Sequence, residues 1–302
     1  MRCSCVIVNY TEPVRSANLA RMLASYDEVE RVFIVDNCSP DDSWERLQEL
    51  KDVPGIILIK SDRNGGYGYG NNLAFRACLE NPLPYERQLL MICNPDTTIT
   101  ASAVAETIEC FAQHPNALAA APVEYDTEGN RYGSTAWEVP SATCYIIQFL
   151  AVLGRIKRVR DYRPEELSNR FSRADCLSGA LLMVDAEHFN EIGLYDEGVF
   201  LFCEETGMGV RSKGIFETYV CTRERYTHEF STSMVTSFPN FRKRTGILSR
   251  SRRHVLLHDY KVTGFKKAMT HLCYGISLLE AWPLAWAYNA LCLYRAHKQR
   301  KA

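Results

Sequence analysis

Residues 31–39 read RVFIVDNCS, and this stretch contains the local pattern that decides the fold. A short run rich in Val and Ile, Arg31–Val35, passes directly into the carboxylate of Asp36 and a polar turn, and helical spacing resumes at Trp44–Leu50. A short apolar run that ends in a polar turn before a helix is typical of a strand in a parallel sheet. Ligands of such sheets bind at the carboxyl ends of the strands, so Asp36 is a candidate ligand-binding residue, with a cap of the following helix as the alternative.

The same alternation extends on both sides of this strand. Apolar runs predict further strands at Cys3–Val8, Ile56–Ile59 and Gln88–Cys93, and helical spacing predicts helices at Val14–Tyr26 and Tyr67–Glu80. Short connections between alternating strands and helices imply a parallel sheet with helices on both faces. We therefore expect an α/β fold whose ligand site is formed by the polar residues that follow the strands.

The pattern is looser after residue 100. The polar residues 126–130 between two short runs suggest a hairpin, and a charged stretch further on suggests a surface loop. We expect helices at 102–114, 186–192 and 202–213, strands at 117–123, 131–134 and 177–184, a surface loop at 155–173, and either a helix or a long buried run at 142–153.

The composition is that of an ordinary globular chain. Of the 302 residues, 46% are hydrophobic and 24% are charged, which excludes wholesale disorder. The twelve cysteines include no C-x-x-C pair, and the apolar run in residues 1–8 is too short for the core of a signal peptide. We therefore expect a cytosolic protein with reduced thiols.

Charge divides the chain into two parts. The 35 Lys and Arg against 36 Asp and Glu give a formal net charge of -1, but residues 241–302 hold 13 of the basic residues and only two of the acidic ones. An asymmetry of this size indicates a segment that meets an anionic partner: a membrane surface, a nucleic acid, or the protein's own acidic body. We expect a body at residues 1–240 and a basic, aromatic-rich helical tail at residues 241–302.

The tail contains a long apolar stretch, Leu272–Tyr294, which has about the length of a membrane span. Glu280, Pro283 and Asn289 interrupt it, and Lys and Arg flank it on both sides. Aromatic residues with flanking cations favour a helix that lies in the membrane interface over a packing helix or a true span. Nucleic acid is not expected as a partner, because the aromatic residues lie among apolar residues and not among the cations.

Four glycines occur in residues 62–72, DRNGGYGYGNN, at the predicted start of a helix. Glycine lets the backbone approach a ligand closely, and the N–H groups at a helix start suit a phosphate. A dinucleotide fingerprint would require glycine at the position of Asn71 and would follow the first strand, so a nicotinamide enzyme is disfavoured.

Two more candidate sites contain carboxylates. Asn94-Pro95-Asp96-Thr97 directly follows a predicted strand and could hold a divalent cation on a diphosphate, although Asn-Pro-Asp is also ordinary turn chemistry. Glu204 and Glu205 follow an aromatic run, and burial of such a pair would raise the pKa of one carboxyl toward that of a general base. The alternative is an acidic helix start. A lone histidine such as His228 is more often structural than a ligand.

The order of these motifs resembles that of family 2 glycosyltransferases, most closely the bacterial rhamnosyltransferase-like branch, over about residues 3–235. The matching motifs are VIVNY at 6–10, VDNCS at 35–39, NGGYG at 64–68, NN at 71–72, NPDT at 94–97, SGA at 178–180, GLYDE at 193–197, EE at 204–205 and His228. The resemblance implies a GT-A fold with a mostly parallel central sheet flanked by helices. It also implies inverting transfer from a nucleotide sugar with Mg²⁺ or Mn²⁺.

The resemblance also assigns roles to single residues. Asp36 would contact the base or ribose of the donor, Asp96 would hold the metal with His228, and Glu205 would be the base. The remaining positions implied for the donor and acceptor site are Asn9, Asn64, Gly65, Gly66, Asn71, Asn94, Gly179 and Ala180.

Two positions depart from the family pattern. The family usually has Glu-Asp where this chain has Glu204-Glu205, and it has another acidic residue where this chain has Gly207. Either Glu204 or Glu205 could therefore be the base. The departures also leave open a non-catalytic subunit that binds a nucleotide sugar or serves as a scaffold in a polysaccharide synthase complex.

The function that we expect is transfer of a hexose, with rhamnose from dTDP-rhamnose favoured and a UDP-sugar possible, to a glycan or lipid-linked acceptor in cell-surface polysaccharide synthesis. The protein would be cytoplasmic and peripheral on the inner face of the cell membrane, with donor and acceptor specificity in loops such as 155–173. A nucleotidyltransferase is disfavoured, because Asn9–Pro13 lacks a glycine-rich loop after the first strand. The sequence makes no prediction of oligomeric state.

Overall fold

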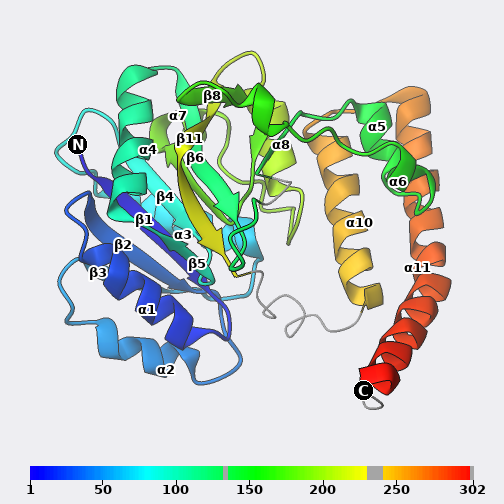
Figure 1. Ribbon diagram of the computed structural model, residues 1–302, viewed down its shortest axis with the longest axis horizontal. Coiled ribbons are helices and arrows are strands. Elements are labelled where there is room, and N and C mark those ends of the chain that lie inside the picture. Colours follow the sequence, from blue (N-terminus) through cyan, green and yellow to red (C-terminus); the bar gives the residue numbers. More distant parts are fainter. Residues whose placement is uncertain (132–134, 230–240, 300–302) are drawn as a thin grey trace. The chain divides into compact units, whose positions relative to one another are not determined.

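Four parallel strands at the N-terminal end of the chain form one half of a nine-stranded sheet in the computed structural model (Figure 1). The structure describes residues 1–131, 135–229 and 241–299. Strands β1 (Cys3–Asn9), β2 (Val29–Asp36), β3 (Ile56–Lys60) and β4 (Leu89–Cys93) lie in the order β3-β2-β1-β4 and confirm the four predicted strands. Asn9 pairs with Asp36 at the last step of the β1–β2 register, so both side chains lie at the carboxyl edge of the sheet.

The other half of the sheet mixes strand directions. β10 (Leu181–Asp185) is antiparallel to β4, and the order continues through β6 (Ala117–Tyr125), β11 (Glu217–His228) and β5 (Thr97–Ile99). β6 and β11 are parallel, whereas β5 and β8 (Phe171–Ala174) are antiparallel to β11. The sheet is therefore parallel in its first half and mixed in its second.

Helices cover both faces of the sheet because alternate strand residues point to opposite faces. One core contains Cys5 and Ile7 of β1 with residues of α1 (Pro13–Ala24) and α4 (Ala101–Gln113), and the other contains Val6 with residues of α3 (Tyr67–Glu80). Two more helices, α7 (Ala186–Glu191) and α8 (Glu204–Ser212), contribute residues to the second core. The chain also forms α2 (Ser43–Leu47) and a 3₁₀ turn at Gln48–Leu50.

Three sequence predictions need correction. The strand predicted at 177–184 is two strands, β9 (Cys176–Leu177), which pairs with β7 (Ala136–Trp137), and β10, because the chain turns at residues 178–180. The predicted surface loop at 155–173 includes a 3₁₀ turn, Pro164–Glu166, and most of β8. The helix predicted at 202–213 begins only at Glu204, because the two preceding residues have left-handed φ angles of 70° and 73°. Of the hairpin strand predicted at 131–134, Arg131 forms an antiparallel bridge with Tyr125, and residues 132–134 lie outside the described residues.

The chain consists of two compact units. Unit 1 contains Met1–Val139, Arg160–Phe200 and Glu204–Ser231, and so includes the whole sheet. Unit 2 contains Pro140–Val159, Leu201–Cys203 and Thr232–Ala302. Unit 2 therefore holds the tail together with an earlier segment that the sequence prediction assigned to the body.

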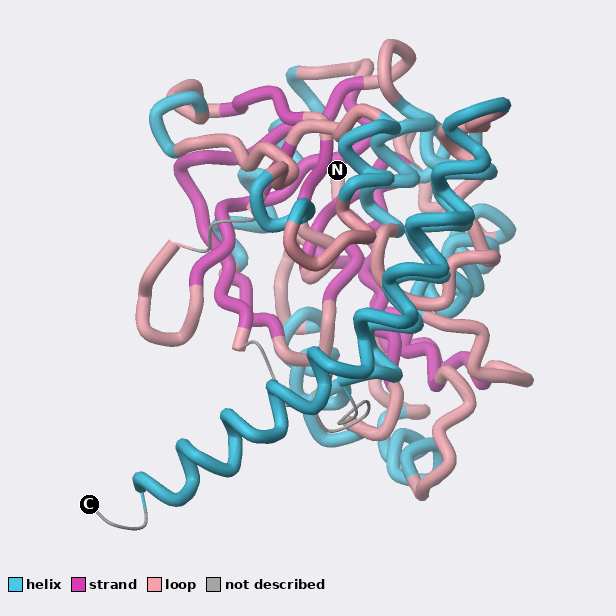
Figure 2. Tube along the Cα trace, turned by 90° about the vertical axis from the view of Figure 1, so that its right-hand side faces the viewer, coloured by secondary structure: helices cyan, strands magenta, loops and turns pink. Residues whose placement is uncertain are grey.

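Unit 2 is helical. It contains α5 (Ala142–Ile147), α6 (Leu153–Ile156), α10 (Phe241–His258) and α11 (Gly264–Gln299), and Figure 2 shows α10 and α11 side by side before α11 continues toward the C-terminus. Of the alternatives for 142–153, the helix is confirmed at Ala142–Ile147, but residues 148–152 form turns, and the exposed Val152 and Leu153 rule out a long buried run. Arg252 of α10 donates a hydrogen bond of 2.6 Å to the carbonyl of Gln148, which ties the earlier segment to the tail.

Two further expectations concern the whole chain. Within the part of the chain that the structure describes, no helix is both long enough and apolar enough to cross a membrane. The eleven cysteines whose side chains the structure describes are all free.

Candidate functional site

Asn9 and Asp36 form a buried hydrogen-bonded group at the ends of β1 and β2. Asn9 Nδ2 donates to Asp36 Oδ1 at 2.9 Å, and Asn9 Oδ1 accepts from the Ser16 hydroxyl at 2.9 Å. The Ser39 hydroxyl donates to the same carboxylate oxygen at 2.6 Å. Hydrogen bonds from Asn9 and Ser39 thus fix the orientation of the Asp36 carboxylate. A carboxylate that binds a ligand needs such a fixed orientation.

The glycine cluster is connected to this group through Asn37. Asn37 Nδ2 donates to Asn64 Oδ1 at 3.2 Å and to the carbonyl of Gly66 at 3.0 Å, and Asn64 Oδ1 accepts from the N–H of Gly66 at 3.1 Å. Gly66 has φ 94°, and a Cβ there would lie 2.1 Å from the carbonyl oxygen of Phe200. A Cβ at Gly65 would lie 2.3 Å from the ring of Tyr69. Only glycine therefore fits at both positions.

Three asparagines near these strand ends have a buried amide oxygen without a hydrogen-bond partner. They are Asn37, Asn71 and Asn94. The amide nitrogen of Asn71 donates to the carbonyl of Tyr67 at 3.0 Å, and the backbone N–H of Asn94 donates to Ala180 at 2.8 Å, so both residues are held in place. Unpaired buried acceptors are costly, which makes each a candidate to accept from a bound ligand.

Asp96, His228 and Glu124 form a line of contacts between β5, β6 and β11. β11 pairs with β5 so that His228 lies opposite Thr97, next to Asp96. His228 Nε2 lies 3.4 Å from Asp96 Oδ1, and His228 Nδ1 lies 2.7 Å from Glu124 Oε1. Burial lowers the pKa of His228, but hydrogen bonds and charge from both carboxylates outweigh burial and raise it to about 9.

This arrangement fits a divalent cation held by two protein ligands. Among the described residues no group of three His, Cys, Asp or Glu side chains forms a metal centre. However, Mg²⁺ and its relatives are often held by one or two protein ligands together with substrate phosphates and water. Glu124 engages Nδ1 of His228 and leaves Nε2 facing Asp96, which is the usual carboxylate–histidine support of a metal ligand.

Glu204 and Glu205 begin α8 and differ in their surroundings. Glu204 is buried, and its Oε1 has no hydrogen-bond partner. Burial, and next the charge of Glu205, hold the pKa of Glu204 well above its usual range. Burial also raises the pKa of Glu205, against a hydrogen bond from the backbone of Gly179 that lowers it. Taken over the whole residue, Glu205 is partly buried, whereas Glu204 is buried.

Gly179 lies in the turn between β9 and β10 and contacts Glu205 closely. A Cβ at Gly179 would lie 2.0 Å from Glu205 Oε1, so any side chain there would displace the Glu205 carboxylate. The carbonyl oxygen of Gly179 accepts a hydrogen bond of 2.7 Å from the hydroxyl of Tyr67, the first residue of α3. A chain of contacts therefore connects the glycine cluster to Glu205.

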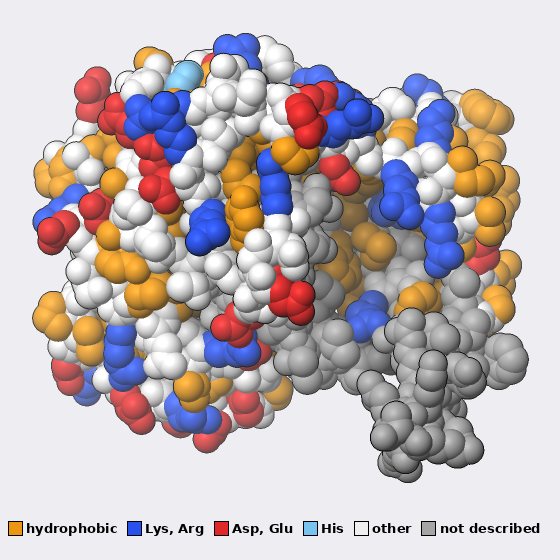
Figure 3. Space-filling view, in the orientation of Figure 1, with side chains coloured by type: hydrophobic (Ala, Val, Ile, Leu, Met, Phe, Trp, Pro, Cys, Tyr) orange, Lys and Arg blue, Asp and Glu red, His pale blue; other side chains and the backbone are white. Residues whose placement is uncertain are grey.

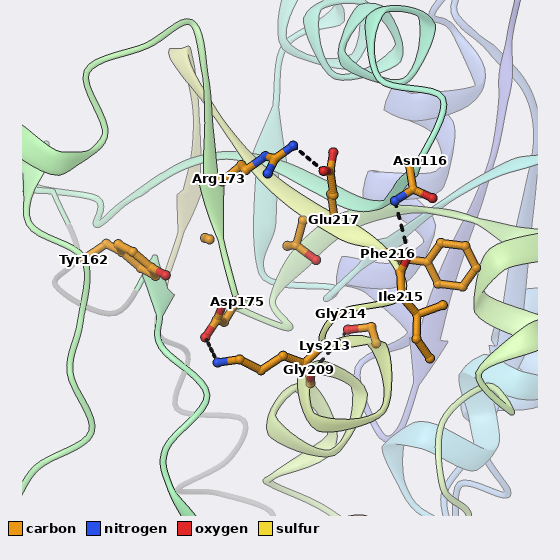
Figure 4. A pocket seen from close by; sticks show the side chains of 13 residues that line it. Asn116, Tyr162, Arg173, Asp175, Gly209, Lys213, Gly214, Ile215, Phe216 and Glu217 are labelled. Carbon is orange, nitrogen blue, oxygen red and sulfur yellow. Dashed lines mark hydrogen bonds and ion pairs between the residues drawn. The ribbon is translucent and has the colours of Figure 1, made fainter.

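A separate pocket of about 310 Å³ lies at the other end of α8 (Figure 4). Its lining includes Gly209 and Ser212 near the C-terminal end of that helix, whereas Glu205 is at the N-terminal end. The charged side chains in its wall are paired, Lys213 with Asp175 at 2.9 Å and Arg173 with Glu217. None of the site residues predicted from the sequence lines it.

The structure thus brings the predicted residues together in two groups within unit 1. Asn9, Asp36, Asn64, Gly65 and Gly66 form one through Asn37, and Asp96 and His228 form the other. Glu124 contacts His228, and its charge also contributes to the raised pKa of Glu205. The sequence prediction missed Asn37, Tyr67 and Glu124 as site residues. The signal available for Glu124 was a single carboxylate in the apolar run of residues 117–125, ALAAAPVEY.

A sheet of this topology, with carboxylates and amides at the carboxyl ends of its parallel strands, is the GT-A fold of nucleotide-sugar transferases. Residues 4–193 match the model of glycosyl transferase family 2. Because this match covers more than half of the chain, the protein belongs to that family and is a glycosyltransferase.

Two curated relatives are rhamnosyltransferases. The N-acetylglucosaminyl-diphospho-decaprenol L-rhamnosyltransferase of Mycobacterium tuberculosis is 27% identical over 226 residues, which cover 70% of this chain and 72% of that protein. The rhamnosyltransferase WbbL of Escherichia coli is 21% identical over 68% of this chain and 75% of that protein.

Solved structures share the fold at low identity. The structure of GalNAc-T7 with UDP, GalNAc and Mn²⁺ aligns with a TM-score of 0.59 at 14% identity and covers 92% of this chain, which spans only 57% of that protein. The mannosyltransferase PcManGT from Pyrobaculum calidifontis, in complex with GDP-Man and Mn²⁺, aligns with a TM-score of 0.57 at 13% identity over 96% of this chain and 75% of that one.

Proposed function

We propose that the protein is an inverting hexosyltransferase that moves rhamnose from dTDP-rhamnose, or a hexose from a UDP-sugar, to a hydroxyl of a glycan or lipid-linked acceptor in cell-surface polysaccharide synthesis. The named activities of the two curated rhamnosyltransferases support the sugar and the lipid-linked acceptor. The observation that carries the proposal is the pair of carboxylate positions at the strand and helix ends, Asp96 beside His228 at 3.4 Å and Glu205 against Gly179.

The donor nucleotide would bind at the first group of residues. Asp36 would accept hydrogen bonds from the base or ribose, and its contacts with Asn9 and Ser39 keep its oxygens in place. Gly65 and Gly66 would line the donor site, and both are glycine because a Cβ there would collide with Tyr69 or Phe200 of the protein itself. The unpaired amide oxygens of Asn71 and Asn94 would accept hydrogen bonds from hydroxyl groups of the nucleotide sugar.

Asp96 and His228 would hold Mg²⁺ or Mn²⁺. A bound divalent cation supplies Lewis-acid stabilisation of the negative charge that develops on a departing diphosphate. The role of the protein's own residues is to present the ligands: Glu124 orients His228, and the backbone N–H of Glu229 donates 2.9 Å to the carbonyl of Asp96.

Glu205 would act as the general base. The acceptor hydroxyl is a poor nucleophile, so the Glu205 carboxylate takes its proton as the hydroxyl oxygen bonds to the anomeric carbon. The bond between that carbon and the diphosphate oxygen breaks with its electron pair leaving on the diphosphate, through a transition state that resembles an oxocarbenium ion. A single displacement inverts the anomeric configuration.

The tail would hold the active site near its acceptor. We propose that residues 241–302, with 13 basic and two acidic residues, associate with the anionic inner face of the cell membrane, where a lipid-linked acceptor would be found. The protein would then be cytoplasmic and peripheral, and unit 1 would form the catalytic part.

A thermal-shift screen of dTDP-, UDP- and GDP-sugars, with Mn²⁺ and with EDTA, tests the donor, because a bound ligand raises the melting temperature according to its concentration and affinity. The donor found is then incubated with a polyprenyl-diphospho-sugar acceptor, and the product is analysed by mass spectrometry. We expect transfer with inversion. Binding of one donor without turnover on any acceptor would instead indicate the non-catalytic subunit, and binding of none would contradict the proposed function.

A further inference from the structure

Exposed large hydrophobic side chains are concentrated in unit 2. Within the described residues, eight of twelve such side chains belong to this smaller unit. They are Val152, Leu153, Ile156, Phe265, Leu272, Leu278, Leu279 and Trp282. Figure 3 shows hydrophobic side chains along the edge formed by α6 and α11, with Lys and Arg beside them. Soluble monomers seldom expose contiguous apolar surface of this kind without a binding function.

The first part of this surface is the α6 segment, residues 152–158 (VLGRIKR). Val152 is 68% exposed and Ile156 is 77% exposed, although both are aliphatic. The three cations of the segment are exposed as well, and the segment contains no acidic residue. Long basic side chains next to exposed aliphatic ones can reach a charged layer while the aliphatic groups enter an apolar one.

The second part is one face of α11. Phe265, Leu272 and Leu279 follow one another at intervals of seven residues and are all exposed, Phe265 at 80%. Because seven residues are close to two helical turns, these side chains lie along one stripe of the helix. The opposite face packs within unit 2: Ser277 is buried, and its hydroxyl donates 3.0 Å to Ser249 of α10.

The two parts are joined by Glu280. Its Oε2 accepts a hydrogen bond of 2.9 Å from the backbone N–H of Ala151, the residue before the α6 segment. The only acidic residue of α11 is therefore bonded to the base of this segment, and α6 lies beside α11 in Figure 1.

Charge indicates what this surface meets. Unit 2 contains sixteen Lys and Arg and only two acidic residues, because the earlier segment adds three cations to the tail. An anionic lipid surface complements such a unit over its whole extent, and its apolar interior accepts aliphatic and aromatic side chains at the same time. An exposed Trp282 fits the headgroup level of a bilayer.

We propose that the α6 segment and the exposed stripe of α11 form one composite membrane-docking surface, in which the aliphatic residues of α6 enter the bilayer beside the α11 stripe. This inference rests on the membrane association proposed above, and it adds a segment about 85–150 residues earlier in the chain than the tail. Residues 155–158 then have a docking role and not a role in donor specificity.

The test compares the full chain with matched variants on sedimenting vesicles of phosphatidylcholine alone and of phosphatidylcholine with phosphatidylglycerol. The α6 variant is V152S/L153S/I156S. The control is V14S/I57S/I215S, which removes three exposed hydrophobic side chains of unit 1. A third variant, L272S/L279S, alters only the stripe. The melting temperature of each variant and its thermal shift with the sugar donor are measured to check that the fold and the donor site are intact.

We expect the α6 variant to bind anionic vesicles about tenfold or more weakly than the parent, since three aliphatic side chains no longer leave water. The control should bind like the parent, and added salt should weaken all binding. If the parent binds and the stripe variant is weakened but the α6 variant is not, the composite surface is wrong and membrane association stands. If the parent does not bind, both fail. Loss of self-association in the α6 variant, with unchanged vesicle binding, would show that α6 is a protein interface and overturn the inference.

Discussion

The hydroxyl of Tyr67 donates a hydrogen bond of 2.7 Å to the carbonyl oxygen of Gly179, and the backbone of Gly179 in turn hydrogen-bonds the carboxylate of Glu205. Tyr67 directly follows the glycine cluster at the start of α3. The path from Tyr67, next to Gly65 and Gly66, to the proposed base thus runs through Gly179. We therefore regard Tyr67 as a positioning residue for Glu205.

Replacing Tyr67 with Phe should lower kcat by about fivefold to tenfold, because loss of one hydrogen bond leaves the Gly179 carbonyl unpaired and the turn less fixed. Donor affinity in a thermal-shift titration should not change. Y69F is the matched control, because it removes another hydroxyl from α3, one that bonds Asp62 at 2.8 Å. Equal losses of kcat in both variants would contradict the positioning role.

Replacing Gly179 with Ala should reduce transfer by about 100-fold or more, because the new Cβ would lie 2.0 Å from Glu205 Oε1 and displace the carboxylate from the acceptor. G246A is the control: a Cβ added at Gly246 would have no side chain or neighbouring element within 4 Å, so activity should be unchanged. The measurement is the initial rate of transfer at saturating donor. A fully active G179A would show that the position of this carboxylate does not matter.

Replacing Glu205 with Gln should abolish transfer more completely than replacing Glu204 with Gln. Glu205 is partly exposed and hydrogen-bonded to a backbone, as a base that meets a substrate must be, whereas Glu204 is buried. A base contributes about 100-fold to 10,000-fold in rate. The reverse order of the two losses would move the base to Glu204.

Glu204 also predicts how stability depends on pH. Its pKa is raised in the folded protein, so the folded state binds the proton more tightly than the unfolded state, whose carboxyl has a pKa near 4.5. Its contribution is fully present below pH 4.5 and is lost as the pH rises through the folded pKa. E204Q, which imitates the protonated acid, should therefore melt higher than the parent near neutral pH but not below pH 4.5. Calorimetric melting at both pH values checks this, and a lower melting temperature of E204Q near neutral pH would contradict it.

Replacing Glu124 with Gln should weaken Mn²⁺ binding in the presence of a nucleoside diphosphate by about tenfold to 100-fold, the usual effect of removing a carboxylate that supports a metal-binding histidine. Titration followed by electron paramagnetic resonance measures this without turnover. E106Q is the control, since Glu106 is also a partly buried carboxylate but pairs with Arg170 and not with His228. If E124Q binds Mn²⁺ like the parent while D96A does not, His228 is not a metal ligand.

The sequence was sufficient to predict candidate site residues that directly follow a strand. It was not sufficient for residues that reach the site only through the pairing of strands distant in the chain. Asp36 and Asp96 follow apolar strands, so local pattern was sufficient to select them. Glu124 became a site residue only because β6 pairs with β11 and β5 pairs with β11 in one particular register. No local pattern contains that register.

The same limit explains the errors in the fold. The turn at residues 178–180 divides an apolar segment into two strands, and it places Gly179 against Glu205, some 26 residues later. The segment 140–159 belongs with the tail through contacts such as Arg252 with Gln148, which are separated by 104 residues. Apolar character predicted that both segments fold, but not what they fold against.

The boundary between the two units has a mechanical consequence. Leu201–Cys203 belong to unit 2, and Glu204, the next residue, returns to unit 1 and begins α8. A single residue therefore separates the proposed base from a part of the chain that folds with the helices of the proposed docking surface. If the proposed docking displaces residues 201–203, that displacement reaches α8 along the covalent backbone, and no surface contact is required.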